Sequence, residues 1–379
     1  MLITDLALQD FRSYASLQLT LPAGISVFLG DNGQGKTNLL EAVGYLATLG
    51  SHRVGQDALL IRKGAEQAVV KAQVQAGLED ERKLQIQVDI NLGKANRAYV
   101  NKTPQRRVRD LIGSLRVVLF APEHLALVKG DPDDRRRFID ELAILRTPRI
   151  AGVKADYERA VKQRTQLLRS LAEHGGDGGG QLEIWDDAVA GFGAELLAAR
   201  LDTLAGLTPL LEAAYRQIAP GEAAATVNYK SSYLGEEPDY RQAILARMRE
   251  RRREELARGL TLVGPHRDDL ELLLDGFPAK GYASHGESWS YALALKLSAF
   301  ALLRADGLEP VLLLDDVFAE LDETRRTRLA EAALSAEQVL VTAAVPRDVP
   351  AQLDGARFRV TTGSVVLQPD GPSVGFSHE

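Results

Sequence analysis

The sequence contains no cysteine, which excludes disulfide bonds, thiolate metal sites and cysteine nucleophiles. Long hydrophobic runs are also missing, because no stretch approaches the ~18 to 20 apolar residues that a membrane-spanning helix needs. The six histidines never stand at helical or finger-type ligand spacings, so no structural zinc site is expected. The N-terminal segment lacks a basic region followed by an apolar one, as in a signal peptide. We therefore expect a cytoplasmic protein with no membrane partner.

Aromatic residues are scarce, at 6% of the chain, and the net charge is −6. Few aromatics argue against base stacking on single strands, and the overall charge gives no sign of a polyanionic partner. Locally the balance reverses, since residues 94–116 hold seven basic residues and one acidic residue. Such a face can bind phosphates while the chain as a whole stays acidic, although a solvated surface is the alternative.

The hydrophobic patterning predicts three parts within the 379 residues. Residues 1–122 alternate as strands of a β-rich lobe, residues 123–258 are mainly helical in period, and residues 259–379 alternate strand with helix. Pro148 is expected to interrupt the helices, and residues 224–233 to form a short strand. We therefore predict an α/β protein in which 1–122 and 259–379 pack into one head, with 123–258 inserted as a helical arm.

"GDNGQGKT" follows a buried strand pattern and opens an amphipathic helix pattern. It matches G-x-x-x-x-G-K-[ST], whose glycines let backbone N–H groups face one anion at a helix N-terminus. A helix-capping glycine turn is the alternative, which the strand–loop–helix context disfavours. Lys36 is expected to reach the β- and γ-phosphates and to serve catalysis, and Thr37 to offer its hydroxyl to Mg²⁺. The predicted ATP-binding residues are Gly30, Asp31, Asn32, Gly33, Gln34, Gly35, Lys36 and Thr37.

A second candidate element is the acidic end of a buried strand, "VLLLDD" at 311–316. Ligands of open α/β sheets bind beyond the carboxyl ends of strands, where the phosphate loop also lies. Asp315 is the predicted Mg²⁺ ligand, through water, and Asp316 is predicted to orient or activate the attacking water. The alternative is a strand that runs into an acidic turn, with Asp322 as the N-cap of the next helix.

These motifs resemble the ATP-binding cassette ATPases, and within them the SMC-like branch with its helical insertion. The chain is most similar to the RecF family of bacterial recombination proteins, over nearly its full length. The segments that carry this resemblance are "FRSY" (11–14), "GDNGQGKT" (30–37), "FAPEHLALVKGDPDDRRRFID" (120–140), "GPHRDDLEL" (264–272), "SHGE" (284–287), "ALALKLS" (292–298) and "VLLLDDVFAELD" (311–322). One departure is the run from His285 to Trp289, where family members commonly have Gln-Gly-Gln-Gln-Arg.

The resemblance implies a head that dimerises on ATP, with two nucleotides at a two-fold interface. Ser284, Gly286 and Glu287 would then form a signature loop acting in trans on the partner's nucleotide. Asp322 would contact the partner's phosphate loop. Thr342 occupies the place where cassette ATPases often carry a γ-phosphate-sensing histidine.

The resemblance also implies DNA binding at gaps or single-strand/duplex junctions, and help in loading recombinase together with RecR and RecO. It links the chain to repair, replication and the SOS response, with a slow, DNA-stimulated ATPase acting as a switch. The candidate DNA-contacting residues are Arg53, Lys102, Arg106, Arg107 and Arg109.

Two alternatives remain open. A transporter-type cassette ATPase would couple ATP to a membrane partner, but the helical insertion favours the DNA-binding class. A serine hydrolase using residues 284–287 is disfavoured, because Ser284 lies in no G-x-S-x-G elbow.

Overall fold

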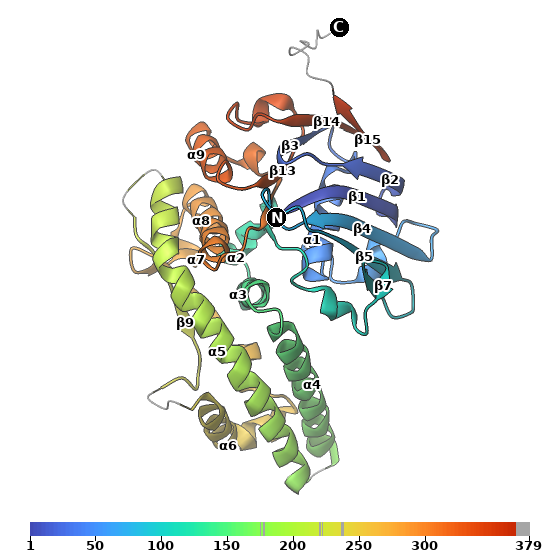
Figure 1. The fold of residues 1–379 in the computed structure, drawn as a ribbon. Helices are drawn as coiled ribbons and strands as arrows, with labels where there is room; N and C mark the ends of the chain where they lie inside the picture. Colours follow the sequence, from blue (N-terminus) through green and yellow to red (C-terminus); the bar gives the residue numbers. More distant parts are fainter. Residues whose placement is uncertain (175, 177–178, 220, 222, 236–238, 369–379) are drawn as a thin grey trace. The chain divides into compact units, whose positions relative to one another are not determined.

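The structure, a computed structural model, describes residues 1–368 except 175, 177–178, 220, 222 and 236–238 (Figure 1). The chain divides into two compact units. The first, called here the head unit, consists of residues 1–125, 214–222 and 292–379. The second, called here the helical unit, consists of residues 126–213 and 223–291.

The head unit contains an antiparallel sheet in the order β2-β1-β4-β5-β6-β7. Alternating burial explains it: in β4 the side chains of Ala68, Val70, Ala72 and Val74 are buried, and the residues between them are not. This is the period of two that the sequence shows. The strands are β1 (Leu2–Phe11), β2 (Tyr14–Thr20), β4 (Gln67–Gln75), β5 (Lys83–Asn91), β6 (Arg97–Val100) and β7 (Thr103–Pro104).

The second sheet of the head unit has the order β15-β14-β3-β13-β12-β8 and draws strands from both ends of the chain. All neighbours in it are parallel except β15, which pairs antiparallel with β14. The predicted α/β class and the joining of the two terminal segments are thus observed. The strands are β3 (Gly24–Leu29), β8 (Val117–Phe120), β12 (Val311–Asp315), β13 (Gln338–Ala343), β14 (Ala356–Thr361) and β15 (Ser364–Gln368). Helices α1 (Lys36–Thr48) and α9 (Glu323–Ala333) follow β3 and β12.

The helical unit contains α2 (Ala126–Lys129), α3 (Pro132–Arg146), α4 (Ile150–His174) and α6 (Tyr240–Arg258), with most of α5 (Gly179–Ile218). Pro148 lies between α3 and α4, as expected for a residue that cannot continue a helix. After α6 come α7 (Ala279–Tyr282) and α8 (His285–Ala305), which runs on into the head unit. Short 3₁₀ helices cover Asp57–Leu60 (η1), Val108–Leu111 (η2), Pro122–Leu125 (η3), Pro265–Arg267 (η4), Val317–Glu320 (η5) and Pro346–Asp348 (η6).

The helical unit extends to Tyr291, past the boundary at residue 258 that the sequence suggested. The reason is a three-stranded sheet, β11-β10-β9, built from β9 (Ala225–Lys230), β10 (Asp269–Leu274) and β11 (Phe277–Pro278). The predicted short strand is β9, and it pairs antiparallel with β10, with Val227 opposite Leu272. Residues 284–287 therefore belong to the helical unit and not to the C-terminal lobe of the head.

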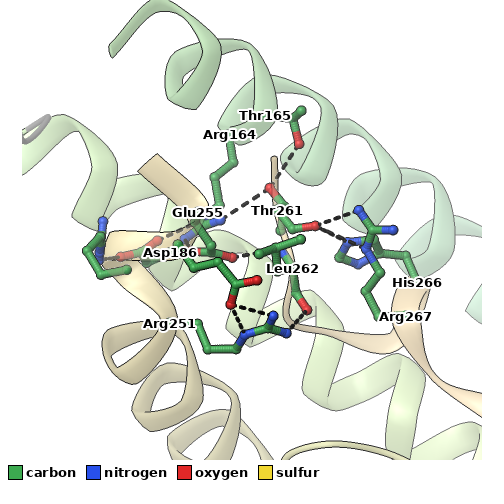
Figure 2. A network of polar contacts seen from close by, with 11 residues as sticks. Arg164, Thr165, Asp186, Arg251, Glu255, Thr261, Leu262, His266 and Arg267 are labelled. Atoms are coloured by element: carbon green, nitrogen blue, oxygen red, sulfur yellow. Dashed lines mark hydrogen bonds and ion pairs between the residues drawn. The ribbon is translucent and has the colours of Figure 1, made fainter. Parts of the chain in front are cut away.

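A buried ion network joins the helices of this unit (Figure 2). Arg164 of α4 is completely buried, at 0% exposure, and it binds Asp186 of α5 at 2.7 Å and Glu255 of α6 at 2.6 Å. Its Nη1 also donates to Thr261 Oγ1 at 3.2 Å. Glu255 in turn accepts the backbone N–H of Leu262 at 2.8 Å. The network thus ties three helices to the segment that leads into β10.

The "GPHRDD" segment is held by the same unit. His266 Nδ1 lies 2.6 Å from the Tyr157 hydroxyl. Figure 2 shows the Arg267 guanidinium, which donates to the Thr261 carbonyl at 3.0 Å. Burial lowers the pKa of His266 to about 4, so it is neutral at pH 7. Asp268 accepts the hydroxyl of Tyr229 at 2.9 Å. These contacts give the segment a structural role in the helical unit.

Candidate nucleotide-binding site

The predicted phosphate loop occupies residues 30–35, between the end of β3 and the start of α1. The Lys36 side chain is almost fully buried and folds back over the loop. Its Nζ donates to the carbonyl of Gly30 at 2.7 Å and to that of Asp31 at 3.2 Å. The ammonium group therefore lies over the loop, where a phosphate chain would be held.

Two glycines of this loop have no room for a side chain. A Cβ on Gly30 would lie 2.3 Å from the Val360 carbonyl oxygen. Gly35 has a φ of +104°, and a Cβ there would lie 2.7 Å from Ser13 Oγ. These two glycines let the loop pack tightly against β14 and against Ser13 and Tyr14, which places its backbone next to the positive end of α1. The cradle fits a nucleoside triphosphate.

Three parallel strands bring the other polar groups to the same edge of the sheet. Thr37 follows β3, Asp315 ends β12 and Thr342 lies near the end of β13, and these strands are neighbours. Thr37 Oγ1 donates to Asp315 Oδ1 at 3.1 Å, and Thr342 Oγ1 donates to the same oxygen at 2.6 Å. Thr342 Oγ1 also accepts the backbone N–H of Asp316 at 2.9 Å. Thr342 thus holds both acidic residues in place.

Asp315 is buried, and burial raises its pKa to about 6, against the lowering effect of the hydrogen bonds from Thr342 and Thr37. A nearby cation would favour the charged form again. Hydroxyl and carboxylate oxygens are the ligands that Mg²⁺ prefers, and it commonly takes one or two carboxylates besides substrate phosphates. The described residues contain no group of three or more His, Asp or Glu side chains that could hold a metal. The Thr37 hydroxyl and the Asp315 carboxylate, 3.1 Å apart beside the phosphate loop, fit Mg²⁺ that binds together with a nucleotide.

Asp316 has the left-handed backbone conformation, with a φ of 47°, directly after β12. Its carboxylate is partly exposed and lies 4.0 Å from Lys36 Nζ. Burial raises the pKa of Asp316, Lys36 opposes this, and Asp348 adds to it. A non-glycine residue in this conformation is a strained position of the kind found at functional sites. The carboxylate lies beside the phosphate loop, where it can act on a water molecule.

A network behind the phosphate loop was missed by the sequence analysis. Glu41 of α1 is fully buried and accepts two hydrogen bonds from Arg12, at 2.8 and 2.6 Å, and one from Ser51 at 2.6 Å. Tyr14 donates to the Gly35 carbonyl at 3.1 Å. Arg12 and Tyr14 belong to "FRSY", which carried the resemblance but received no role. The signal that could have revealed this network is Glu41 itself, a glutamate on an otherwise apolar helix face, which needs a partner when it is buried.

The candidate DNA-contacting residues differ in their surroundings. Arg53 is 37% exposed and lies 3.7 Å from Glu41 and 4.0 Å from Glu123, so two carboxylates already share its charge. Lys102, Arg106 and Arg107 are exposed near β7 and η2, and Arg109 is half-buried. The basic stretch therefore forms an exposed surface, whereas Arg53 lies against the helix that follows the phosphate loop.

Ser284 and Glu287 form a capping box at the start of α8. Ser284 Oγ accepts the N–H of Glu287 at 3.2 Å, and Glu287 Oε2 accepts the N–H of Ser284 at 2.8 Å. Gly286 lies between them in the first turn. The Ser284 hydroxyl is thus engaged with the helix backbone, while His285 Nδ1 lies 3.3 Å from Lys129 Nζ. This geometry offers no serine–histidine pair to a hydrolase.

Asp322 is the N-cap of α9, as the sequence suggested, and its carboxylate accepts the N–H of Arg325 at 2.9 Å. It also pairs with the Arg325 guanidinium. The residue is half-exposed, so capping leaves part of the carboxylate accessible.

Comparison with known proteins agrees with these observations. The model of the RecF/RecN/SMC N-terminal domain matches residues 2–354. The "DNA replication and repair protein RecF" of Streptomyces avermitilis is 56% identical over 372 residues, covering 96% of this chain and 99% of the relative. The protein of the same name from Cutibacterium acnes is 53% identical, covering 97% of this chain and 98% of the relative.

Solved structures give the same family. The recombination mediator protein RecF with ATPγS superimposes with a TM-score of 0.88 at 27% identity, covering 97% of this chain and 98% of that one. The structure of RecF with ATP gives 0.88 at 26% identity, covering 97% of both chains. The Smc head domain of Pyrococcus furiosus gives 0.54 at 17% identity, a likeness of fold alone.

These matches do not support the transporter-type alternative. Among the described residues no helix is both long and apolar enough to span a bilayer. With a family model over nearly the whole chain and relatives more than half identical along it, the chain belongs to the RecF family.

Proposed function

We propose that this chain is an ATP-dependent DNA-binding protein of recombinational repair and replication, with a slow ATPase that acts as a switch. One observation carries the proposal: Thr37, Asp315 and Thr342 meet at a phosphate loop over which Lys36 is folded. Relatives named for DNA replication and repair, and RecF structures with ATP in the RecFOR pathway, support it.

In this proposal ATP is the substrate and Mg²⁺ the cofactor. Lys36 and the N–H groups of the loop and of the first turn of α1 bind the β- and γ-phosphates. Thr37 would hold Mg²⁺ directly and Asp315 would hold it through water, and the bound ion would supply neutralisation of phosphate charge. Asp316 orients the attacking water, and Thr342 fixes Asp315 and Asp316 relative to each other. The full set of ATP-binding residues is 30–37.

The switch is dimerisation. Ser284, Gly286 and Glu287 at the N-terminus of α8 would bind the γ-phosphate of a second copy's ATP, aided by the positive end of that helix. Asp322 would contact the partner's phosphate loop. ATP then contributes binding energy between the subunits, and hydrolysis removes the contact.

DNA binding is assigned to the exposed basic stretch around Lys102, Arg106, Arg107 and Arg109, with Arg53 a further candidate. Contacts to phosphates make such binding independent of sequence and sensitive to salt. RecR, RecO and a recombinase are the expected protein partners at gapped DNA. The proposal also places the protein in the SOS response and in replication, and in the cytoplasm.

Sedimentation velocity with ATP and Mg²⁺, with and without a short duplex, tests the proposal. Wild-type protein should dimerise with ATP, whereas Lys36→Met and Ser284→Arg should stay monomeric. Ser335→Arg, at an exposed serine after α9, is the matched control and should dimerise normally. A wild type that remains monomeric at all ATP and DNA concentrations contradicts the proposal.

A further inference from the structure

Two aromatic side chains of the helical unit contact each other on its surface. Phe277 of β11 is 58% exposed and Tyr282 of α7 is 73% exposed. Their ring centroids are 5.6 Å apart, with the planes tilted by 33°. The other strongly exposed large hydrophobic residues in the described part of the chain are aliphatic. Water-exposed aromatic pairs of this kind are typical of contact surfaces, where they become buried.

The pair is held in place before any partner arrives. Asp275 and Gly276 both have positive φ, of 50° and 79°, and Leu274 pairs with Phe277. This is the two-residue hairpin turn whose twist matches the flanking strands. On the other side, Lys280 Nζ donates to the Gly130 carbonyl at 2.9 Å and lies 3.6 Å from Asp131. Little conformational entropy would therefore be lost on binding.

The aromatic pair is continuous with the signature loop. Tyr282 stands two positions before Ser284 in the sequence. The end of α2 touches both segments, because α2 packs against α7 and Lys129 Nζ lies 3.3 Å from His285 Nδ1 (Figure 1). The two rings thus lie close to Ser284 and Gly286 along the chain, and both segments contact the same short helix.

The charge around the pair indicates a protein partner. Lys129 and Lys280 are balanced by Asp131 and Asp275, so the patch lacks the excess of positive charge that nucleic-acid phosphates require. An apolar aromatic centre with a mixed polar rim is the anatomy of a protein–protein interface.

We propose that Phe277 and Tyr282 form an apolar anchor that docks against a second copy of this chain in the ATP-bound dimer. The inference rests on the proposed function, because that function sets Ser284 against the partner's nucleotide. It adds a contact that does not involve phosphate, so nucleotide binding by one copy and association of two copies become separable.

Sedimentation velocity with Mg²⁺ and a slowly hydrolysed ATP analogue tests the anchor. The variants are Tyr282→Ala, Phe277→Ala with Tyr282→Ala, and the conservative Tyr282→Phe. Ile184→Ala is the matched control, because this side chain is 68% exposed on another helix of the same unit. Binding of a fluorescent ATP analogue to the diluted monomer, and a thermal midpoint, accompany each variant.

We expect the double variant to raise the dimer dissociation constant about tenfold or more. Tyr282→Phe and Ile184→Ala should dimerise like wild type, and monomer affinity for nucleotide should not change. If the wild type dimerises and the double variant does so equally well, the anchor is refuted while the proposed function stands. Normal dimers with weakened duplex binding would assign the patch to DNA and also refute it. A wild type that never dimerises refutes the proposed function itself.

Discussion

Thr37 Oγ1 lies 3.1 Å from Asp315 Oδ1, although the two residues are 278 positions apart. The contact joins the first turn of the phosphate-loop helix to the end of β12. It exists because β13 pairs in parallel with both β3 and β12, so that the carboxyl ends of all three strands coincide. Both groups of the expected Mg²⁺ site are therefore positioned by sheet pairing.

Thr37→Val should lower Mg²⁺-dependent ATP affinity about tenfold or more, because a hydroxyl ligand is lost within a site of hard oxygen donors. Thr37→Ser keeps the hydroxyl and should bind like wild type. Isothermal titration with Mg²⁺ and with EDTA measures the effect. Equal affinities of the valine and serine variants in Mg²⁺ would show that Thr37 is no ligand.

Asp315→Asn should stabilise the nucleotide-free protein at neutral pH. Because burial raises the pKa of Asp315 to about 6, its contribution to stability is present at low pH and is lost as the pH rises through 6. Asparagine avoids this cost, so the variant should gain about 3 kcal/mol at pH 8 and nothing below about pH 4. Urea unfolding across pH measures it, and a gain that does not vary with pH would contradict the assignment.

Thr342→Val should lower kcat roughly tenfold to a hundredfold with little change in KM. The variant loses the hydroxyl that donates to the Asp315 carboxylate and accepts the backbone N–H of Asp316, so the backbone that places the water-positioning Asp316 side chain is no longer held. Thr342→Ser should restore most of the rate. Steady-state ATP hydrolysis by all three proteins tests this, and a valine variant with wild-type kcat would remove Thr342 from the mechanism.

Arg164→Met should destabilise the helical unit by about 3 to 5 kcal/mol, because the buried Glu255 would lose its ion-pair partner and Asp186 would keep only Arg252. Arg258→Met is the control: Arg258 makes an exposed pair with Glu254 and should cost under about 1 kcal/mol. Tryptophan fluorescence follows the helical unit, since Trp185 and Trp289 are the chain's two tryptophans and both lie in it. Similar unfolding midpoints for the two variants would contradict the prediction.

Replacing Arg106 and Arg107 together by Glu should weaken binding to duplexes of every sequence. The slope of log affinity against log salt concentration should fall by the equivalent of about two phosphate contacts. Arg82→Glu provides the control, as an exposed arginine in the turn before β5. Fluorescence anisotropy at several salt concentrations measures both. ATP-dependent dimers should form in each variant, and unchanged DNA affinity of the double variant would place the DNA surface elsewhere.

Much of the site was predictable because its signals are local. The phosphate loop is one continuous motif, and its strand, turn and helix carry their own periodicity and glycines. The same holds for the acidic end of β12 and for Asp322, whose capping contact spans three residues. The break at Pro148 and the start of α8 near Ser284 are likewise set by residues next to one another.

Other features were decided only by tertiary structure. Nothing near Glu41 in the sequence shows that Arg12 will neutralise its carboxylate and that Ser51 will donate a hydrogen bond to it. Likewise, the sequence around residue 258 does not show that β9 will pair with β10, which lies beyond that residue. The exposure of Phe277 and Tyr282 is also a property of what packs around them. Local sequence determined which groups could bind a nucleotide. Strand pairing between distant segments decided which of them meet, because hydrogen-bond register and burial depend on residues that periodicity along the chain does not connect.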